Sequence, residues 1–248
     1  MIGEPRWMPW LTYGVLILGV VIIGFPVWVA IAAATQSIEQ VRDVPMSMGI
    51  GAEFFNNLHT VLDSGAGNSA APVGRMVFNT FVVALVIAVG KIVISLLSAY
   101  AFVFFRFPGR TLAFWLIFIT LMLPVEVRIM PTYEVMASLN LINTYTGLTL
   151  PLIASATATF LFRQFFMTIP PSLVDAARID GASPMRFFFD VLLPLSRTNI
   201  AALFVITFTY GWNQYLWPLL TTTDESMYTV VVGIKRMLAG NDAVTEWH

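Results

Sequence analysis

Lys91 is the one charged residue in the long apolar stretch 76–105, and it lies near the centre of that stretch. A charge at the middle of a membrane-spanning helix is costly, so it often marks the path of a substrate or ion. A cation at this position would suit an anionic substrate. The structural alternative stays open, in which Lys91 pairs with a partner subunit or with a backbone carbonyl group.

Two further charged residues, Glu126 and Arg128, follow the apolar run 111–125, and Pro124 lies near the end of that run. The planar guanidinium of Arg128 could bind a phosphate through two parallel hydrogen bonds. An ion pair of Arg128 with Glu126 or with Glu134 accounts for the same charges equally well. Arg128 is therefore a candidate for the substrate path, with Glu126 as its possible partner.

A polar pair, Asn213 and Gln214, interrupts the apolar run 198–220 and has Trp212 before it and Tyr215 after it. Polar residues at membrane depth commonly form hydrogen bonds between helices, which is the simpler interpretation. The alternative is a polar substrate site with aromatic walls. Trp212, Asn213 and Gln214 complete the set of candidate substrate-path residues.

A different pattern lies between Ile169 and Pro194. Ser172 is a candidate helix N-cap with Asp175 three residues later, Gly181 is suited to end a helix, and Ser183 and Pro184 predict the start of a second helix. The residues of that second helix which share one apolar face, suited to fill a groove, are Phe187, Phe188, Val191, Leu192 and Leu195. The spacing predicts two short helices joined by a glycine turn, and an amphipathic element lying on lipid is the competing interpretation.

The composition requires a membrane around these residues. Hydrophobic residues make up 58% of the 248 residues and charged residues 11%, whereas soluble domains are about a quarter charged. The net charge of −1 argues against nucleic-acid binding, and the sequence has no cysteine and two histidines, which leaves little for a metal site. Neither histidine lies in an apolar run, so an intramembrane hydrolase is disfavoured.

Uncharged or nearly uncharged runs mark the expected spans, because crossing a bilayer takes about 20 apolar helical residues. Such runs exceed the length of a barrel strand, so an all-α, polytopic helical bundle is predicted, forming one transmembrane domain over 1–248. The segment between the last two spans, 168–197, is predicted to be a cytoplasmic loop, whereas 35–75 is predicted to be an outer segment without a strong helix. The five expected spans are 10–34, 76–105, 111–129, 145–166 and 198–220.

Arginine and lysine set the expected orientation. With the N-terminus in the cytoplasm, the inside segments 1–9, 106–110 and 163–197 hold seven basic residues, Arg110 and Arg163 among them. Their density is about twice that of the five basic residues in outside segments. The chain would then end outside after an odd number of spans, so we expect that a sixth span is missing.

The segment 168–197 resembles the EAA loop of permease subunits of binding-protein-dependent ABC importers. In that loop E-A-A, three residues, G, nine residues and I-x-L-P follow one another; here Asp175 replaces the usual Glu and Val191 replaces Ile. The resemblance implies that the loop couples the permease to its ATPase. The residues to which it assigns that role are Asp175, Ala176, Ala177, Asp180, Gly181, Ala182, Ser183, Pro184, Phe187 and Pro194.

The resemblance covers most of the chain. Residues 122–131, 141–150 and 210–218 are similar to permeases of the maltose-type carbohydrate importers, and residues 121–129 and 154–166 to permeases of sn-glycerol-3-phosphate importers. This implies a type I importer permease of the bacterial inner membrane, without a catalytic site or cofactor of its own.

The partners implied by the resemblance are a homologous permease, two ATPase subunits that bind ATP and Mg, a periplasmic binding protein and the lipid bilayer. sn-Glycerol-3-phosphate or a related glycerophosphodiester is the expected substrate, and a neutral sugar is the alternative. A secondary transporter that uses Lys91, Glu126 and Arg128 as an ion relay is a further alternative, although no duplicated halves are visible.

Overall fold

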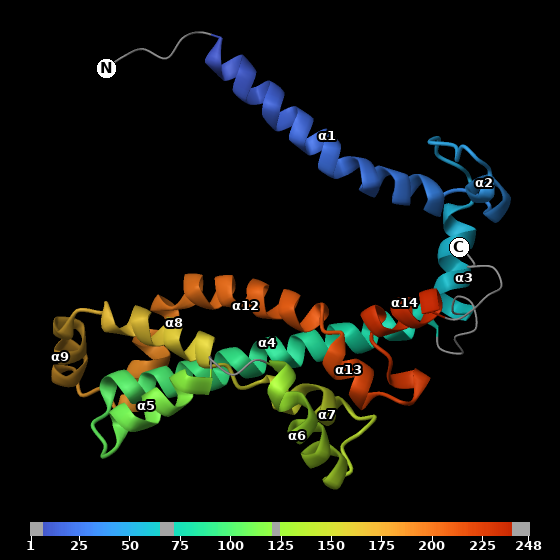
Figure 1. Ribbon diagram of the computed structural model, residues 1–248. Coiled ribbons are helices and arrows are strands. Elements are labelled where there is room, and N and C mark those ends of the chain that lie inside the picture. Colours follow the sequence, from blue (N-terminus) through green and yellow to red (C-terminus); the bar gives the residue numbers. More distant parts are fainter. Residues whose placement is uncertain (1–6, 65–71, 121–124, 240–248) are drawn as a thin grey trace. The chain divides into compact units, whose positions relative to one another are not determined.

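The computed structural model describes residues 7–64, 72–120 and 125–239, which form helices connected by loops and no strand (Figure 1). The chain divides into two compact units. One comprises residues 1–74 together with 236–248, and the other comprises residues 75–235. The candidate residues proposed from the sequence all belong to the second unit.

The first unit is built around α1 (Met8–Ala34), whose most apolar window has a mean hydropathy of 2.8. Within its own unit, this helix is apolar on all sides and nearly bare, which suits a helix surrounded by lipid. Two shorter helices follow, α2 (Ile38–Arg42) and α3 (Phe54–Ser64). The prediction of no strong helix in 35–75 was wrong, since α3 places apolar residues at helical spacing on one face.

Hydrogen bonds hold the end of α1 to the loop behind it. The Gln36 amide donates to the carbonyl oxygens of Ser47 (2.8 Å) and Gly49 (2.7 Å). The Asn57 amide of α3 donates to the carbonyl oxygens of Ala34 (3.1 Å) and Gln36 (2.9 Å). The last carbonyl groups of a helix have no partner within it, so the Asn57 amide caps α1 at Ala34, whereas the Gln36 amide fixes the loop that follows the helix.

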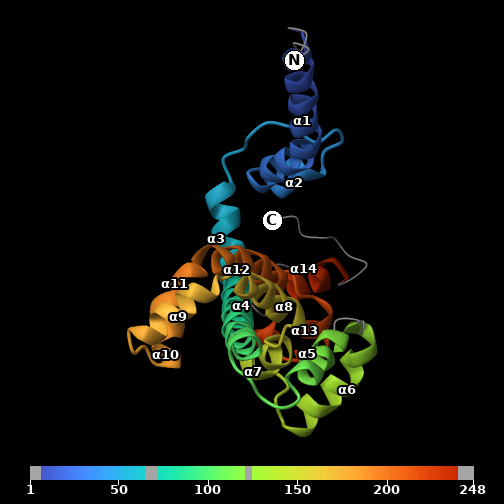
Figure 2. The same cartoon turned by 90° about the vertical axis from the view of Figure 1, so that its left-hand side faces the viewer.

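The second unit is organised along α4 (Val73–Phe104), the longest helix of the chain among those described, which belongs to this unit from Arg75 onward (Figures 1 and 2). Its face toward the other helices alternates small and branched residues, and α8 and α12 run beside it. The elements that follow are α5 (Arg110–Ile119), α6 (Val125–Ser138), α7 (Tyr145–Thr149), η2 (Leu150–Leu152), α8 (Ala156–Met167), α9 (Pro171–Ile179), α10 (Pro184–Phe187), the π-helical η3 (Phe188–Leu192), α11 (Leu193–Leu195), α12 (Arg197–Trp212), α13 (Leu216–Thr221), η4 (Glu225–Met227) and α14 (Val230–Ala239).

The main core lies around the C-terminal half of α4. Side chains of α4, α8, α10 and η3 interlock there, with Leu203 of α12 closing the group. Gly211 of α12 passes so close to Ala84 that an added Cβ atom would lie 2.9 Å from the Ala84 Cα atom. The buried members of this core are Ile92, Leu96, Ala99, Tyr100, Ala158, Phe162, Phe166, Ile169, Phe187, Phe188, Leu192 and Leu203.

Two smaller cores lie toward the other end of α4. Val83 and Ile87 pack on Leu148 of α7, and Trp217 of α13 packs on Ile129 and Met136 of α6. The Trp217 indole N–H donates to the carbonyl oxygen of Gly147 (3.1 Å), so its one polar group is satisfied in this apolar setting.

The helices bear on the expected spans as follows. By length and apolar composition, α1 and α4 each reach across a membrane, and α7–η2 with α8 forms a pair bent by 48°. The segments Pro184–Leu195 and Arg197–Trp212 form a second pair, bent by 71° near Pro194. The expected third span contains α5 and the start of α6, and residues 121–124 between them lie outside the described part. The total of five spans therefore stays a prediction.

Candidate functional site

The segment 171–195 contains the residues for which the sequence predicts ATPase coupling, and we call it the coupling segment after that prediction. It begins at Pro171 of α9. Its N-cap is Pro170, which provides no side-chain hydrogen bond. The predicted capping box of Ser172 and Asp175 was therefore wrong, because Pro171 already supplies a residue suited to the first helical position without an N–H to be capped. Asp175 instead forms an exposed ion pair with Arg178 at 3.5 Å.

The turn of the coupling segment agrees with the prediction. Asp180 ends α9, and Gly181 follows with φ +71°, in the left-handed region that glycine adopts without strain. The Ser183 hydroxyl accepts a hydrogen bond from the Arg186 backbone N–H (3.3 Å), and Pro184 occupies the first turn of α10. Apart from Gly181 itself and its two neighbours in sequence, no atom of the described chain lies within 4 Å of a Cβ atom built on Gly181, so the space around it is open.

The apolar face of the second helix has a role that differs from the expected one. Phe187, Phe188 and Leu192 are buried in this chain's own core, where they cannot fill the groove of another protein. A π-helical turn over Phe188–Leu192 widens the helix at this point. Leu195, assigned to the same face, is 51% exposed, because the chain bends directly after it.

One hydrogen bond fastens the coupling segment to α4. The Tyr100 hydroxyl donates to the carbonyl oxygen of Pro184 at 2.7 Å, and the Tyr100 ring lies 5.1 Å from the Phe188 ring. Phe104 adds an edge contact with Phe187 at 5.5 Å. The C-terminal end of α4 and the coupling segment are thus joined through aromatic packing and one polar contact.

The exposed surface of the coupling segment carries apolar residues that were not predicted from the sequence. Ile179 is 86% exposed, and Met185 and Phe189 are each more than half exposed. Ile179 and Met185 lie within four residues of Gly181 in sequence, and Phe189 follows in η3. The signal was available, since Ile179 lies between the charged residues Arg178 and Asp180, and Phe189 lies off the face chosen for burial.

Lys91 is buried at 8% exposure, and its ammonium group lies 3.8 Å from the centroid of the Tyr210 ring. Among the residues that the structure describes, no carboxylate forms an ion pair with it. The cation is stabilised by the electron-rich face of an aromatic ring, a contact that leaves its charge available to an anion. Tyr210 was not among the predicted site residues, although it precedes Asn213 by three positions.

Arg128 of α6 is exposed and close enough to Lys91 to interact with it electrostatically, so the two predicted cations belong to one region. Its backbone carbonyl oxygen accepts a hydrogen bond from the Thr132 hydroxyl at 2.7 Å. The Glu126 side chain lies outside the described part of the chain. The alternative of a Glu126–Arg128 ion pair therefore stays open.

The residues Trp212, Asn213 and Gln214 lie where α12 ends and the chain leaves the helical path before α13. The Asn213 amide donates to the carbonyl oxygen of Thr209 (2.9 Å), and the Gln214 amide donates to that of Tyr210 (3.3 Å). These bonds lie within one segment and do not support a role as links between helices. Trp212 packs its ring 5.8 Å from that of Phe208.

The region of Lys91, Tyr210 and residues 212–214 brings together a buried cation, an aromatic ring and a break in an apolar helix. Irregular backbone at membrane depth is tolerated where it is buried in protein or lines a cavity. The region could hold a polar anion by charge and hydrogen bonds, whereas no cluster of three or more metal-ligating side chains occurs within the described residues.

Comparisons with known proteins identify the family of this chain. Residues 91–242 match the family described as binding-protein-dependent transport system inner membrane component. The sn-glycerol-3-phosphate transport system permease protein UgpE of Yersinia enterocolitica is 58% identical over 248 residues, and that of Escherichia coli K12 is 59% identical. Each alignment covers 100% of this chain and 88% of the relative.

Among solved structures, a chain of a bacterial ABC transporter involved in the import of the acidic polysaccharide alginate superposes with a TM-score of 0.82 at 19% identity, covering 100% of this chain and 86% of the other. At that identity the likeness concerns the fold, and it confirms the all-α membrane permease architecture. With the family match and the full-length relatives, the chain belongs to the inner-membrane permease components of binding-protein-dependent ABC importers.

Proposed function

We propose that this chain is the permease subunit through which an ABC importer takes up sn-glycerol-3-phosphate or a related glycerophosphodiester. The identity of 58–59% over the whole chain with sn-glycerol-3-phosphate permeases is the observation that carries the substrate. The buried cation Lys91 supports it, because a phosphate ester is an anion.

The partners in this proposal are a homologous permease, two ATPases that bind ATP and Mg, and a periplasmic binding protein. The permease subunit itself performs no catalysis and holds no cofactor. The N-terminus and the coupling segment face the cytoplasm, in keeping with the distribution of arginines.

Coupling to the ATPase is assigned to the exposed turn around Gly181. The apolar side chains of Ile179, Met185 and Phe189 would contact the ATPase, together with the small residues of the turn. Movement of this surface would pass to α4 through Phe187, which packs on Phe104 of α4, and through the hydrogen bond from Tyr100 of α4 to Pro184. Phe187 is thus a residue that transmits motion rather than one that touches the ATPase.

The substrate path is assigned to the region of Lys91, Tyr210, Asn213 and Gln214. In the structure the Lys91 charge has an aromatic ring as its partner, which a phosphate would supplement or replace. The exposed Asn213 would be accessible to hydroxyl groups of the glycerol, and the exposed Arg128 would meet the phosphate near the outer end of the path. Alternating access of the helical bundle would move the site between the two sides.

The decisive experiment is uptake of labelled sn-glycerol-3-phosphate into proteoliposomes that contain both permeases, the ATPases and the binding protein. Uptake should require ATP and be inhibited by unlabelled glycerol-3-phosphate but not by maltose. Inhibition by maltose alone would favour the neutral-sugar alternative. Uptake by this chain without the ATPases, driven by an ion gradient, would identify a secondary transporter instead.

Two glycine variants separate a conformational role of the turn from a docking role. Asparagine adopts positive φ more readily than most residues, so Gly181→Asn should preserve the turn while adding a side chain. We expect Gly181→Asn and Gly181→Asp to lower ATP-driven uptake by at least tenfold, with unchanged amounts of inserted protein. Normal uptake by Gly181→Asn would remove the close-docking role from this glycine.

The substrate path is tested with Lys91→Gln and its matched control, Lys91→Arg. Loss of the cation in Lys91→Gln should raise the half-saturating substrate concentration of uptake about tenfold or more. Lys91→Arg keeps the charge and should raise that concentration less. Arg128→Gln should produce a smaller rise, since that side chain is exposed. Unchanged half-saturation in both glutamine variants would exclude these cations from the path.

A further inference from the structure

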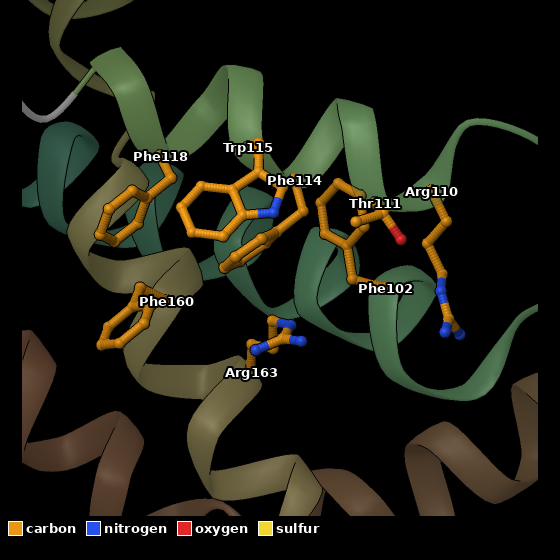
Figure 3. A pocket seen from close by; sticks show the side chains of 8 residues that line it. All are labelled: Phe102, Arg110, Thr111, Phe114, Trp115, Phe118, Phe160 and Arg163. Atoms are coloured by element: carbon orange, nitrogen blue, oxygen red, sulfur yellow. The ribbon is translucent and has the colours of Figure 1, made fainter.

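A pocket of about 310 Å³ lies between α5, α8 and the end of α4, away from the region of Lys91 (Figure 3). This volume falls at the lower end of the roughly 300–1,000 Å³ typical of small-molecule sites. Five of the eight residues that line it are aromatic, and two are arginines. Neither the coupling segment nor the candidate substrate path includes any of these residues.

The two arginines of the pocket are held in place without a carboxylate. The Arg163 guanidinium lies 4.3 Å from the centroid of the Phe114 ring, and Arg110 donates a hydrogen bond to the carbonyl oxygen of Phe105 at 3.2 Å. Among the described residues neither guanidinium has an ion pair, and both side chains are half-buried. Each therefore keeps several donors for an anion, which phosphate oxygens would accept well.

The pocket is also polar at one end and apolar at the other. Figure 3 shows Arg110 at one end and Phe118 at the other, with Phe160 beside Phe118 and with Trp115 and Arg163 between the ends. The rings of Phe118 and Phe160 lie 5.7 Å apart. A free phosphate ion would use the two arginines alone, whereas an amphipathic phosphate ester would use the arginines together with the rings of Phe118 and Phe160.

The location along the chain favours a lipid. Arg110 and Arg163 lie at the predicted cytoplasmic ends of two spans, where basic pockets between helices bind anionic headgroups. This orientation rests on the proposed function. Trp115 fits the same level, because tryptophan is enriched where lipid headgroups meet the apolar core.

We propose that this pocket binds an anionic phospholipid of the inner leaflet, with the headgroup phosphate between Arg110 and Arg163 and the upper acyl chain against Phe118 and Phe160. The site would fasten α5 to α8 through the lipid, at the end of the bundle that carries the coupling segment. This lipid site is separate from the path proposed for the transported substrate. A result that excluded the lipid would therefore leave the proposed import function standing.

Trp115 provides the readout, measured on the complete importer reconstituted in nanodiscs. Phosphatidylglycerol with brominated acyl chains is compared with brominated phosphatidylcholine at equal mole fractions in a phosphatidylcholine background. The contribution of Trp115 is the fluorescence quenching lost in Trp115→Phe. We expect brominated phosphatidylglycerol to quench the Trp115 fluorescence several-fold more effectively than brominated phosphatidylcholine does.

Charge variants test the headgroup contact. Arg110→Gln and Arg163→Gln should each weaken the apparent affinity for phosphatidylglycerol about fivefold, from roughly 1 kcal/mol per basic residue near an anionic surface. Arg163→Lys keeps the charge and should lose less. Arg197→Gln is the matched control, because this arginine is exposed, lies in a predicted inside segment and does not line the pocket.

Three results would overturn the proposal: equal quenching by the two lipids, a preference unchanged in Arg110→Gln/Arg163→Gln, or an equal loss in Arg197→Gln. Removal of the preference by millimolar inorganic phosphate at constant ionic strength would assign the pocket to a free phosphate instead. ATP hydrolysis stimulated by the binding protein, measured on the same nanodiscs, identifies any variant that has lost its fold. If the wild-type importer in proteoliposomes takes up no substrate in any lipid, that result counts against the proposed function and not against this site.

Discussion

The two ends of α4 are attached to the rest of their unit by different means. At the C-terminal end, Tyr100 and Phe104 pack on Phe187 and Phe188 of the coupling segment, with one hydrogen bond among the aromatic contacts. At the N-terminal end, polar groups dominate. The Asn79 amide donates to the carbonyl oxygens of Ser226 (2.9 Å) and Tyr228 (3.0 Å), and its own oxygen accepts from the Tyr145 hydroxyl (2.6 Å).

This difference suits opposite mechanical tasks. Hydrogen bonds are directional and are lost when their geometry changes, so the Asn79 end is held at one position. Packed aromatic rings have no such requirement and tolerate small sliding movements as long as contact is kept. We infer that α4 is fixed where Asn79 binds residues 226–228 and adjustable where the coupling segment meets it.

The largest effect is expected at the apolar end. Leu192→Ala should destabilise the protein by about 2–5 kcal/mol, because a fully buried side chain leaves a cavity that its neighbours fill only in part. The thermal midpoint of the purified importer measures this loss. Leu195→Ala, three residues away but half exposed, is the control and should change little.

The polar end should respond strongly to loss of its central amide. Asn79→Leu removes the partner of two carbonyl groups and one hydroxyl, for a cost of about 1–3 kcal/mol. A double-mutant cycle with Tyr145→Phe measures the coupling between the two side chains, since residues in contact do not act additively. Strict additivity would show that the polar network does not act as a unit.

A smaller effect is expected from the single hydrogen bond at the apolar end. Tyr100→Phe keeps the ring and should cost about 1 kcal/mol in the thermal midpoint assay. ATP-driven uptake should fall further than stability alone explains if the coupling segment is positioned by this contact. Tyr13 is an exposed tyrosine of α1, so an equal fall in ATP-driven uptake for Tyr13→Phe would contradict this interpretation.

The smallest effect concerns Asp224, beside the polar end. Hydrogen bonds from the Ser226 backbone N–H and side chain lower the pKa of this exposed carboxyl group, so the folded protein binds its proton less readily than the unfolded chain. The stabilisation is complete above the unfolded pKa and is lost as the pH falls through the lower, folded pKa. The advantage of wild type over Asp224→Asn in thermal midpoint should therefore shrink on acidification, and a constant difference would contradict this assignment.

The coupling segment was the part most open to prediction from sequence, because its signals are local. Gly181, Ser183 and Pro184 each act within one helical turn, and the structure confirms their conformations. The partners of the apolar face could not be inferred in the same way. Burial of Phe187 and Leu192 depends on α4 and α8, whose surfaces are brought there by the fold.

The candidate substrate path shows the opposite balance. Lys91 and Asn213 were recognisable because polar groups are costly in apolar runs. The contact of Lys91 with Tyr210 joins residues more than a hundred positions apart, which no local rule predicts. Similarly, the sequence marked Arg110 and Arg163 as orientation signals, whereas the pocket that they share with Phe114 arises only when α5 packs on α8.

The hydrogen bonds of Asn79 also constrain the order in which the molecule is made. Its acceptors on Ser226 and Tyr228 lie 147 and 149 residues further along the chain. A ribosome that feeds the chain into the membrane from the N-terminus delivers the Asn79 amide long before those carbonyl groups exist. Until residues 226–228 emerge, the amide needs water, lipid headgroups or the insertion machinery as its partner, so the newly made α4 is completed by nearly the last part of the chain that the structure describes.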